Sequence, residues 1–425
     1  MTLSNKISSI RRKKGLSQTE LAQAVNFSQS YINRVEQGNR TISEEFLNAF
    51  RQVVDLPNVP LTDNEVELFK ARLRSWKDII NYGDYDKARE LKPGLAQSAK
   101  WSQEPELQIY FDLYDASFYH ATRDMDKRNE IIASLSTNPH TFNGEQQYLR
   151  LRLVGIRELS VWKYRTALTS FLEAEKLGES LGLNDEGLYY NIAYCFTDMG
   201  YAYLANEFFE KSLQMLHSKA NYSYDNQIRS FIAWNISQLG KTDEALAILE
   251  GCIREEKSKA TSISNIGAFY KSIARIHHRI GNFAEAIENV DEAASHFEPT
   301  SKSYGYNLYY KAIILIENNK MNEGMDCLNE SLGFFDDASL EHLKLSMLRH
   351  STSLNKPSSL KFIESTAIPK LLDHGAYQEL IMHCDKIRVH YEAKNMYKKA
   401  YEYSHLSQKL TTIIHKGVIT YEKDL

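Results

Sequence analysis

The first 55 residues alternate apolar and polar positions with the period of short α-helices. The capping box Ser17-Gln-Thr-Glu20 predicts a helix start, because its hydroxyl and carboxylate satisfy the first free amides of a helix. That helix carries an apolar stripe formed by Leu21, Ala24 and Val25. A second stripe, ended by Gly38, is formed by Ile32 and Val35. Two short helices joined by a tight turn predict a helix-turn-helix within a head of four or five helices.

Two further capping boxes lie on either side of a break. Thr41-Ile-Ser-Glu44 predicts the last helix of the head, and Thr62-Asp-Asn-Glu65 predicts a long connector helix. Between them, Pro57 and Pro60 prevent a helix from continuing. We therefore expect a head over residues 1–56, a linker and connector helix over 57–80, and a separate body over 81–425.

The body repeats in steps of 38 to 41 residues. The repeated phrase resembles "GNFAEA", and its last positions are Ala88, Arg128, Ala167, Ala205, Ala245, Ala286, Gly324 and Ala400. Twelve residues before these anchors stand Trp76, Ala116, Gly155, Ala193, Ala233, Ala274, Ala312 and Arg388, and seven residues after them stand mostly small side chains such as Ser212 and Ser331. Two columns of small residues let paired helices approach closely, as tetratricopeptide (TPR) repeats require. The spacing predicts an all-α fold in which about nine lengthened, TPR-like helix pairs form a right-handed α-solenoid.

Such a solenoid lines its concave wall with the first helix of every pair. Positions near the first small column on these helices combine aromatic, cationic and amide side chains. Aromatic rings bind apolar groups, cations bind carboxylates, and amides bond to an extended peptide backbone. Aromatic residues at helical spacing are also common in cores, so each tyrosine remains open to either interpretation. The candidate peptide-binding residues are Arg152, Tyr190, Asn191, Tyr194, Asn226, Gln227, Ser230, Trp234, Lys271, Arg275, His278, Tyr306, Asn307 and Tyr309.

Composition agrees with a soluble helical protein. Hydrophobic residues make up 43% and charged residues 25%, and 8 Pro and 19 Gly are few for 425 residues. No run of 18 apolar residues is present, and the N-terminus lacks the apolar core of a secretion signal, so we expect a cytoplasmic protein. The four cysteines are far apart, which favours core thiols over a disulfide framework or a zinc site.

The charge is divided unevenly between head and body. Residues 1–55 hold eight Lys and Arg against five Asp and Glu, which gives a net charge of +3. Because the net charge of the whole chain is −4, the remaining residues carry a net charge of −7. A basic head on an acidic body is expected if the head alone meets a polyanion such as double-stranded DNA.

The stretch "RRKKGLSQTELAQAVNFSQSYINRVEQG" resembles the XRE/Cro type of DNA-binding domain. The resemblance implies that the second helix of the pair lies in the major groove, that Lys13 and Lys14 attract phosphates, and that Arg11 pairs with Glu36. Lys13 and Lys14 could instead be a solvated helix end, and Tyr31 could stack on the DNA backbone or cap the small core. The implied DNA-binding residues are Gln18, Ser28, Gln29, Ser30, Tyr31, Asn33, Arg34 and Arg40.

The order of head and repeats resembles the RRNPP group of peptide-pheromone receptors, which includes PlcR, PrgX, NprR and the Rgg regulators. The resemblance implies a homodimer that binds a short signalling peptide in the TPR groove during quorum sensing. Peptide binding would then change the dimer shape and so its binding to the DNA operator. Two alternatives remain: a groove that binds a protein partner, such as an antirepressor or a response regulator, and a scaffold whose head no longer binds DNA.

The sequence offers little for an enzyme. It has no P-loop, no GxGxxG after a strand, no HExxH and no GxSxG. The neighbouring pair His277 and His278 has no carboxylate or cysteine at metal-ligand spacing in the sequence. We therefore expect no catalytic residues, no metal and no cofactor.

Overall fold

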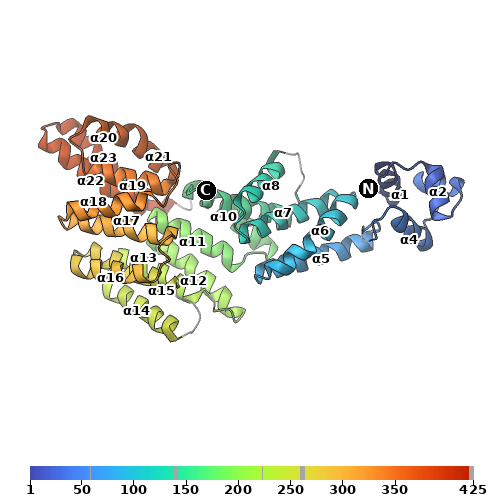
Figure 1. Ribbon diagram of the computed structural model, residues 1–425, viewed down its shortest axis with the longest axis horizontal. Helices are drawn as coiled ribbons and strands as arrows, with labels where there is room; N and C mark the ends of the chain where they lie inside the picture. Colours follow the sequence, from blue (N-terminus) through green and yellow to red (C-terminus); the bar gives the residue numbers. More distant parts are fainter. Residues whose placement is uncertain (58, 138–141, 223, 259–263, 421–425) are drawn as a thin grey trace. The chain divides into compact units, whose positions relative to one another are not determined.

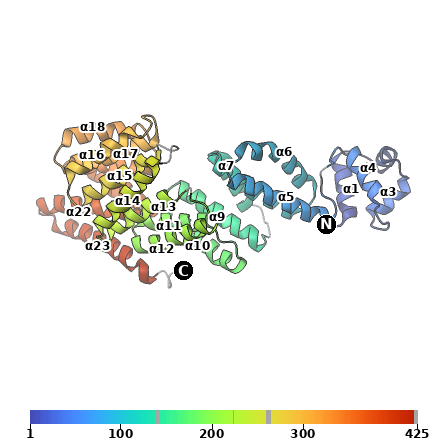
Figure 2. The ribbon, with the colours of Figure 1, turned by 90° about the horizontal axis from the view of Figure 1, so that it is seen from below.

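The computed structural model describes residues 1–57, 59–137, 142–222, 224–258 and 264–420, and every regular element in these ranges is a helix (Figures 1 and 2). These residues form two compact units, Met1–Val154 and Gly155–Leu425. The prediction of an all-α chain with an N-terminal helix-turn-helix and a region of paired helices is confirmed.

The first unit begins with four short helices around one apolar core. They are α1 (Leu3–Lys13), α2 (Gln18–Val25), α3 (Gln29–Glu36) and α4 (Glu44–Val53). The predicted capping box at the start of α2 is present: Glu20 N donates to Ser17 Oγ at 3.1 Å, and Ser17 N donates to Glu20 Oε2 at 2.7 Å. Helices α2 and α3 are the predicted helix-turn-helix.

Two details of the predicted head are wrong. The buried stripe of α2 is Leu21, Ala22 and Val25, whereas Ala24 is exposed, because only the first set lies on the face toward α3 and α4. The last helix of the head is capped by Ser43, whose hydroxyl accepts from Phe46 N at 3.2 Å, and not by Thr41. Ser43 stands directly before the first helical residue, so it reaches the free amides that Thr41 cannot reach.

The rest of the first unit is two helix pairs. Helices α5 (Asp63–Asn81) and α6 (Tyr85–Trp101) form one, and α7 (Pro105–Ala121) and α8 (Met125–Thr137) form the next. The predicted capping box of Thr62 and Glu65 starts α5. The boundaries of the predicted linker and body remain a prediction.

The second unit continues the pairing. The division between the units falls inside α9 (Gly144–Ser160), and α9 is followed by α10 (Tyr164–Leu181). The pairs stack in chain order (Figures 1 and 2). Their helices are α11 (Glu186–Met199), α12 (Ala202–Ser218), α13 (Asp225–Gln238), α14 (Thr242–Ser258), α15 (Ser264–Arg279), α16 (Phe283–Ser295), α17 (Lys302–Glu317), α18 (Met321–Leu332), α19 (Leu340–Ser351), α20 (Pro357–Phe362), the π-helical turn Ile363–Ala367, α21 (Ile368–His374), α22 (Tyr377–Ala393) and α23 (Tyr397–Thr420).

Small side chains lie where the two helices of a pair meet. The column predicted on the first helices is fully buried at Ala193, Ala233, Ala274 and Ala312. At Gly155 even a Cβ atom would lie 2.5 Å from the ring of Phe171, which is itself fully buried. The small column is therefore required by the close approach of paired helices.

Polar bonds tie the helices of several pairs together. Ser212 and Ser331, from the second small column, donate to the carbonyl oxygens of Glu186 at 2.9 Å and Gly305 at 2.7 Å. Trp76, the large exception in the first column, is buried and donates from its indole nitrogen to Ala88 O at 2.9 Å. These bonds satisfy polar groups that the contact removes from water.

The C-terminal helices return to the start of the second unit. Helix α22 packs against α19 and also against α11, and Gln378 donates to the side chain of Gln238. The imidazole Nδ1 of His374 lies 3.2 Å from Trp162 O. Of the predicted core thiols, Cys195, Cys252 and Cys384 are buried and free, whereas Cys327 is only half-buried.

We expect Gly155→Val to lower the free energy of unfolding by about 1–3 kcal/mol, because its side chain overlaps the immobile Phe171 ring. Gly94→Ala is the control, since a Cβ at this helical glycine meets nothing within 4 Å; it should stabilise the chain by roughly 0.5–1 kcal/mol. Thermal denaturation followed by circular dichroism measures both, and equal midpoints for the two variants would contradict the packing argument.

Candidate functional site

An ion pair inside the head fixes the first three helices. Arg11 Nε lies 2.6 Å from Glu36 Oε1 and Arg11 Nη2 lies 2.9 Å from Glu36 Oε2, and the two side chains are only 8% and 5% exposed. Gln18 Nε2 also donates to Glu36 Oε2 at 2.8 Å. Burial raises the pKa of the Glu36 carboxyl, but the hydrogen bonds from Arg11 and Gln18 outweigh it, so this pKa lies below its usual value. The expected pairing of Arg11 with Glu36 is confirmed.

Helix α3 presents a polar face. Ser28 caps it by accepting from Tyr31 N at 3.1 Å, and Ile32 and Val35 turn inward to the core. The opposite face is exposed and carries Gln29, Ser30, Asn33 and Arg34. Their amide and guanidinium groups are free to face a DNA groove, although Asn33 Oδ1 accepts from Gln37 Nε2 at 3.1 Å.

Tyr31 belongs to the core of the head. Its ring centroid lies 4.9 Å from Phe27 and 5.4 Å from Phe46, and its hydroxyl accepts from Ser43 N at 3.5 Å. Arg40 is exposed, and its guanidinium carbon lies 5.5 Å from the Tyr31 ring. Of the two interpretations of Tyr31, the structure thus favours the core cap.

The head is anchored to the turn between α6 and α7. The ammonium of Lys6, which is 1% exposed, lies 2.5 Å from Glu104 Oε1 and donates to Leu61 O at 3.0 Å. Trp101 packs against the core of the head, and the ammonium groups of Lys13 and Lys14 lie 5.8 Å and 5.4 Å from its ring. Sequence reasoning missed this anchor, because its partners are about a hundred residues apart.

We call one face of α11, α13, α15 and α17 the repeat wall, because it carries predicted peptide-binding side chains. This face is continuous from α11 to α17. Its aromatic end is on α11 and α13, where Tyr190 and Tyr194 both pack edge-on against Phe231. Gln227 Nε2 donates to the Tyr190 hydroxyl at 3.1 Å. These contacts join neighbouring helix pairs at the face and leave its side chains half-buried.

A cationic centre follows on α15. The guanidinium carbon of Arg275 lies 3.7 Å from the ring of Trp234 on α13 and 4.7 Å from the ring of Tyr310 on α17. The ammonium of Lys271, one turn earlier, lies 5.9 Å from the ring of Tyr306. Sequence reasoning chose Tyr309 and missed Tyr310, which is the tyrosine that meets Arg275.

At the far end of the repeat wall, side chains of the wall form hydrogen bonds to carboxylates of the chain. Tyr306 donates to Glu341 Oε1 at 2.7 Å, and the buried Tyr309 donates to Glu379 Oε1 on α22 at 2.6 Å. His278 Nε2 lies 2.8 Å from Glu317, so the folded chain supplies the carboxylate that the sequence neighbours of His278 lack. His278 and then Lys386 hold the pKa of the Glu317 carboxyl at about 2, against the opposing effect of burial.

Four other predicted side chains differ in their surroundings. Asn226 and Asn307 are 4% and 1% exposed. The amide of Asn226 donates to Glu256 Oε1 on α14, the second helix of its own pair, and the amide of Asn307 donates to Val290 O on α16, the second helix of the preceding pair. They therefore hold helix pairs together. Ser230 donates to Gln227 O within its helix, and Asn191 is half-buried on α11.

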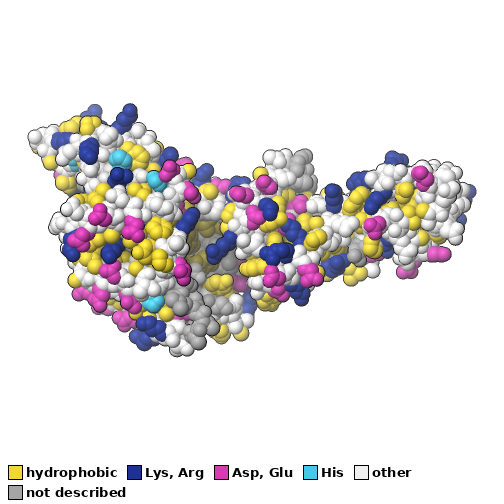
Figure 3. Space-filling view, viewed as in Figure 1, with side chains coloured by type: hydrophobic (Ala, Val, Ile, Leu, Met, Phe, Trp, Pro, Cys, Tyr) yellow, Lys and Arg dark blue, Asp and Glu magenta, His cyan; other side chains and the backbone are white. Residues whose placement is uncertain are grey.

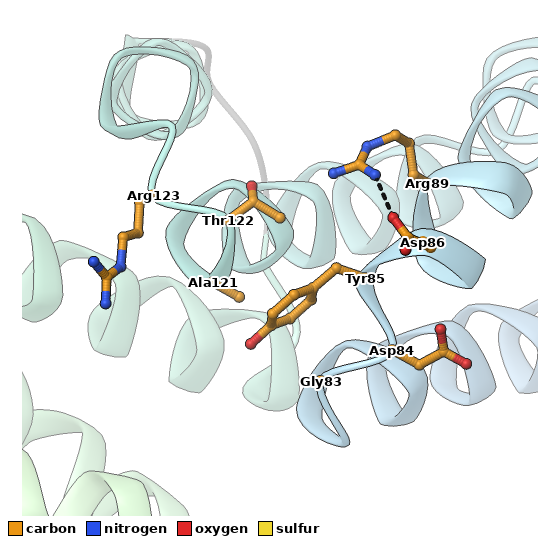
Figure 4. Close-up of a pocket in the computed structure, with 8 residues that line it drawn as sticks. All are labelled: Gly83, Asp84, Tyr85, Asp86, Arg89, Ala121, Thr122 and Arg123. Atoms are coloured by element: carbon orange, nitrogen blue, oxygen red, sulfur yellow. Dashed lines mark hydrogen bonds and ion pairs between the residues drawn. The ribbon is translucent and has the colours of Figure 1, made fainter. Parts of the chain in front are cut away.

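Arg152 lies in α9 within the first unit, with its guanidinium carbon 5.5 Å from the Tyr148 ring. A separate shallow hollow in this unit opens between the turns that join α5 to α6 and α7 to α8 (Figure 4). Its charged side chains Arg89 and Asp86 are exposed and paired at 2.7 Å. We place no site there. The hollow is lined by Gly83, Asp84, Tyr85, Asp86, Arg89, Ala121, Thr122 and Arg123.

On the face drawn in Figure 3, the described charged side chains form no single patch of one sign. Figure 3 shows basic and acidic side chains interspersed over this face of the molecule. The described residues contain no group of three or more His, Cys, Asp or Glu side chains suited to a metal ion. No described helix combines the length and hydropathy that a membrane crossing requires.

Comparison with known proteins identifies the head. Residues 7–56 match the helix-turn-helix family HTH_3. The head is a helix-turn-helix domain. The transcriptional activator NprA of Geobacillus stearothermophilus is 18% identical over 408 residues, which cover 89% of this chain and 96% of that protein. The chain accordingly carries a helix-turn-helix head of the DNA-binding type and resembles a transcriptional activator over most of its length.

Solved structures show the same fold in the repeats. NprR in complex with its cognate peptide NprX matches with a TM-score of 0.72 and 19% identity, over 81% of this chain and 99% of that one. A Rap protein complexed with competence and sporulation factor matches with a TM-score of 0.68 and 15% identity, over 82% and 99%. The apo form of the quorum sensor NprR from B. thuringiensis matches with a TM-score of 0.61 and 20% identity, over 82% of this chain and 100% of that one. The resemblance to RRNPP-type regulators is confirmed in fold.

We expect Glu36→Gln to destabilise the head by about 3 kcal/mol, because it leaves the buried Arg11 guanidinium without its anion. The lowered pKa of Glu36 means that this stabilisation is present at neutral pH and is lost as the pH falls through that pKa. Hydrogen exchange of α1 to α3 in the full chain at pH 7 measures the effect. Glu45→Gln, at an exposed carboxyl, is the control; equal protection in both variants would contradict this assignment.

Proposed function

We propose that this chain is a cytoplasmic transcriptional regulator that senses a short signalling peptide. In this proposal, residues 1–56 bind the operator, residues 57–80 connect, and residues 81–425 bind the peptide and form a homodimer. The continuous repeat wall, with aromatic, amide and cationic side chains on four successive first helices, is the observation that carries the proposal. A solved structure of the same fold in complex with its cognate peptide supports it.

The DNA-binding part rests on the exposed face of α3. Gln29, Ser30, Asn33 and Arg34 point away from the core of the head, and amide and guanidinium groups suit adenine and guanine edges. Gln18, held by Glu36, places the start of α2, where main-chain amides and the helix dipole favour a phosphate. The exposed Arg40 and Ser28, the N-cap of α3, complete the proposed surface, and Tyr31 supports it from the core of the head.

The peptide-binding part rests on side chains that the wall exposes. Tyr190, Tyr194, Gln227, Trp234 and Arg275 are half-buried and lie on adjacent helices, so one extended peptide could contact all of them. Asn226 and Asn307 are left out, because their buried amides already donate to Glu256 on α14 and to Val290 O on α16. Binding at the wall would shift the packing of first helices and hence the separation of two heads, with a coupling of about 1–3 kcal/mol.

For DNA, we expect Gln29→Ala to change the preferred operator sequence, because it removes a base-edge contact. Lys14→Ala should weaken binding to all sequences and reduce the salt slope by about one. Binding measured on selected and random DNA fragments at several salt concentrations separates the two effects. If both variants act equally on specific and random DNA, α3 does not read the operator.

For peptide, the full chain can be used to select from a display library of random seven-residue peptides. An enriched peptide should change operator affinity by roughly 5- to 150-fold. Trp234→Ala should weaken its binding by about tenfold or more, since Trp234 is a half-buried aromatic ring held against Arg275. Tyr203→Ala, at an exposed ring on α12, is the matched control. If no peptide is enriched, the proposal fails and a protein partner becomes the better explanation.

A further inference from the structure

Helix α15 places two cations one turn apart on the repeat wall. Lys271 and Arg275 stand four residues apart, so they share one face of the helix. Arg275 is held between the rings of Trp234 and Tyr310, which fix its plane. The ammonium of Lys271 lies about 6 Å from three rings, those of Phe297, Tyr306 and Tyr310.

Neither cation has an anion within the described chain. No described Asp or Glu carboxylate forms an ion pair or a hydrogen bond with Lys271 or Arg275. The carboxylates at this end of the wall have other partners. Glu341 and Glu379 accept from Tyr306 and Tyr309, and Glu317 is held by His278 and Lys386.

Such an arrangement opposes folding. Two like charges one turn apart repel each other, and their surroundings of aromatic rings remove much of their hydration. Burial first, and the charge of Arg275 second, lower the pKa of Lys271 to about 8. Destabilising groups of this kind that persist in a folded protein are commonly functional.

We propose that Lys271 and Arg275 form a carboxylate-binding subsite of the repeat wall, which reads an acidic side chain or the C-terminal carboxylate of the peptide ligand. This inference rests on the proposed peptide-sensing function and names the charge that the peptide must carry. Arg275 offers a planar fork already oriented by Trp234 and Tyr310, and Lys271 adds a compact second charge. The rings of Trp234 and Tyr306 would contact the apolar groups next to the carboxylate.

The test starts from peptides enriched by the full chain in a library of random seven-residue sequences. Each enriched peptide is resynthesised with its Asp or Glu replaced by Asn or Gln, and separately with its C-terminus amidated. Calorimetric titration should show a loss of about tenfold or more when one of these carboxylates is neutralised, because a charge-assisted bond is removed. The two series distinguish a side-chain carboxylate from the C-terminal one.

Variants of the subsite should remove this discrimination. Lys271→Met should bind the carboxylate peptide about tenfold more weakly than the wild type, but should bind the neutralised peptide equally well. Lys271→Arg, which keeps the charge, should restore most of the preference. Lys176→Met, at an exposed lysine on α10 and so outside the wall, should change nothing. Thermal melting of Lys271→Met at or above the wild-type midpoint is expected, because an unpaired cation has been removed from the rings.

The outcomes separate the two proposals. If no peptide is enriched, the peptide-sensing function and this subsite both fail. If peptides are enriched but their affinity is indifferent to the carboxylate, the subsite alone is overturned. An equal loss of the charged and neutralised peptides in Lys271→Met, with an unchanged melting midpoint, would also overturn it, because Lys271 would then contribute contact area and not charge.

Discussion

The close approach of the two helices in each pair is the constraint on which the structure depends. At Gly155 and at the buried alanines Ala193, Ala233, Ala274 and Ala312 there is no room for a larger side chain against the partner helix. Because one side of each first helix packs against its partner helix, the opposite side faces the neighbouring pairs and forms the repeat wall. A residue directly after the small position, such as Trp234 after Ala233 or Arg275 after Ala274, is therefore carried to the same face in successive pairs. The recurrence of alanine thus sets the place of the functional side chains.

The same geometry explains which predictions succeeded. Capping boxes at Ser17 and Thr62 are local, so sequence alone located both helix starts, whereas at Thr41 a better-placed serine two residues on took the role. The repeat was visible because a small residue at a helix contact has no substitute. The sequence determines less well which way a polar side chain turns. Asn226 and Asn307 directly adjoin the wall residues Gln227 and Tyr306, yet Asn226 turns toward α14 of its own pair and Asn307 toward α16 of the preceding pair. Tyr309 and Tyr310 are adjacent, and only the packed structure decides that the second meets Arg275.

Long-range contacts were beyond sequence reasoning for a different reason. The return of α22 to α11 depends on the curvature accumulated over several helix pairs, and no motif encodes it. It brings Glu379 to Tyr309 and Lys386 to Glu317, so these carboxylates already have hydrogen-bond partners within the chain. This arrangement concentrates the uncompensated positive charge at Lys271 and Arg275. The charge pattern of the wall therefore depends on contacts between distant helix pairs and not on any single repeat.

The anchor of the head follows similar physics. A lysine ammonium is rarely buried, and Lys6 is tolerated at 1% exposure because Glu104 and the Leu61 carbonyl replace its water. These partners come from the linker and from the turn between α6 and α7, so the orientation of α1 is tied to the first helix pairs through one charged group and the Trp101 ring. Loss of Glu104 alone would leave a buried charge without an anion, and the head would have to release Lys6 to water. The Lys6 contact is therefore the link through which the packing of α6 and α7 bears on the orientation of α1.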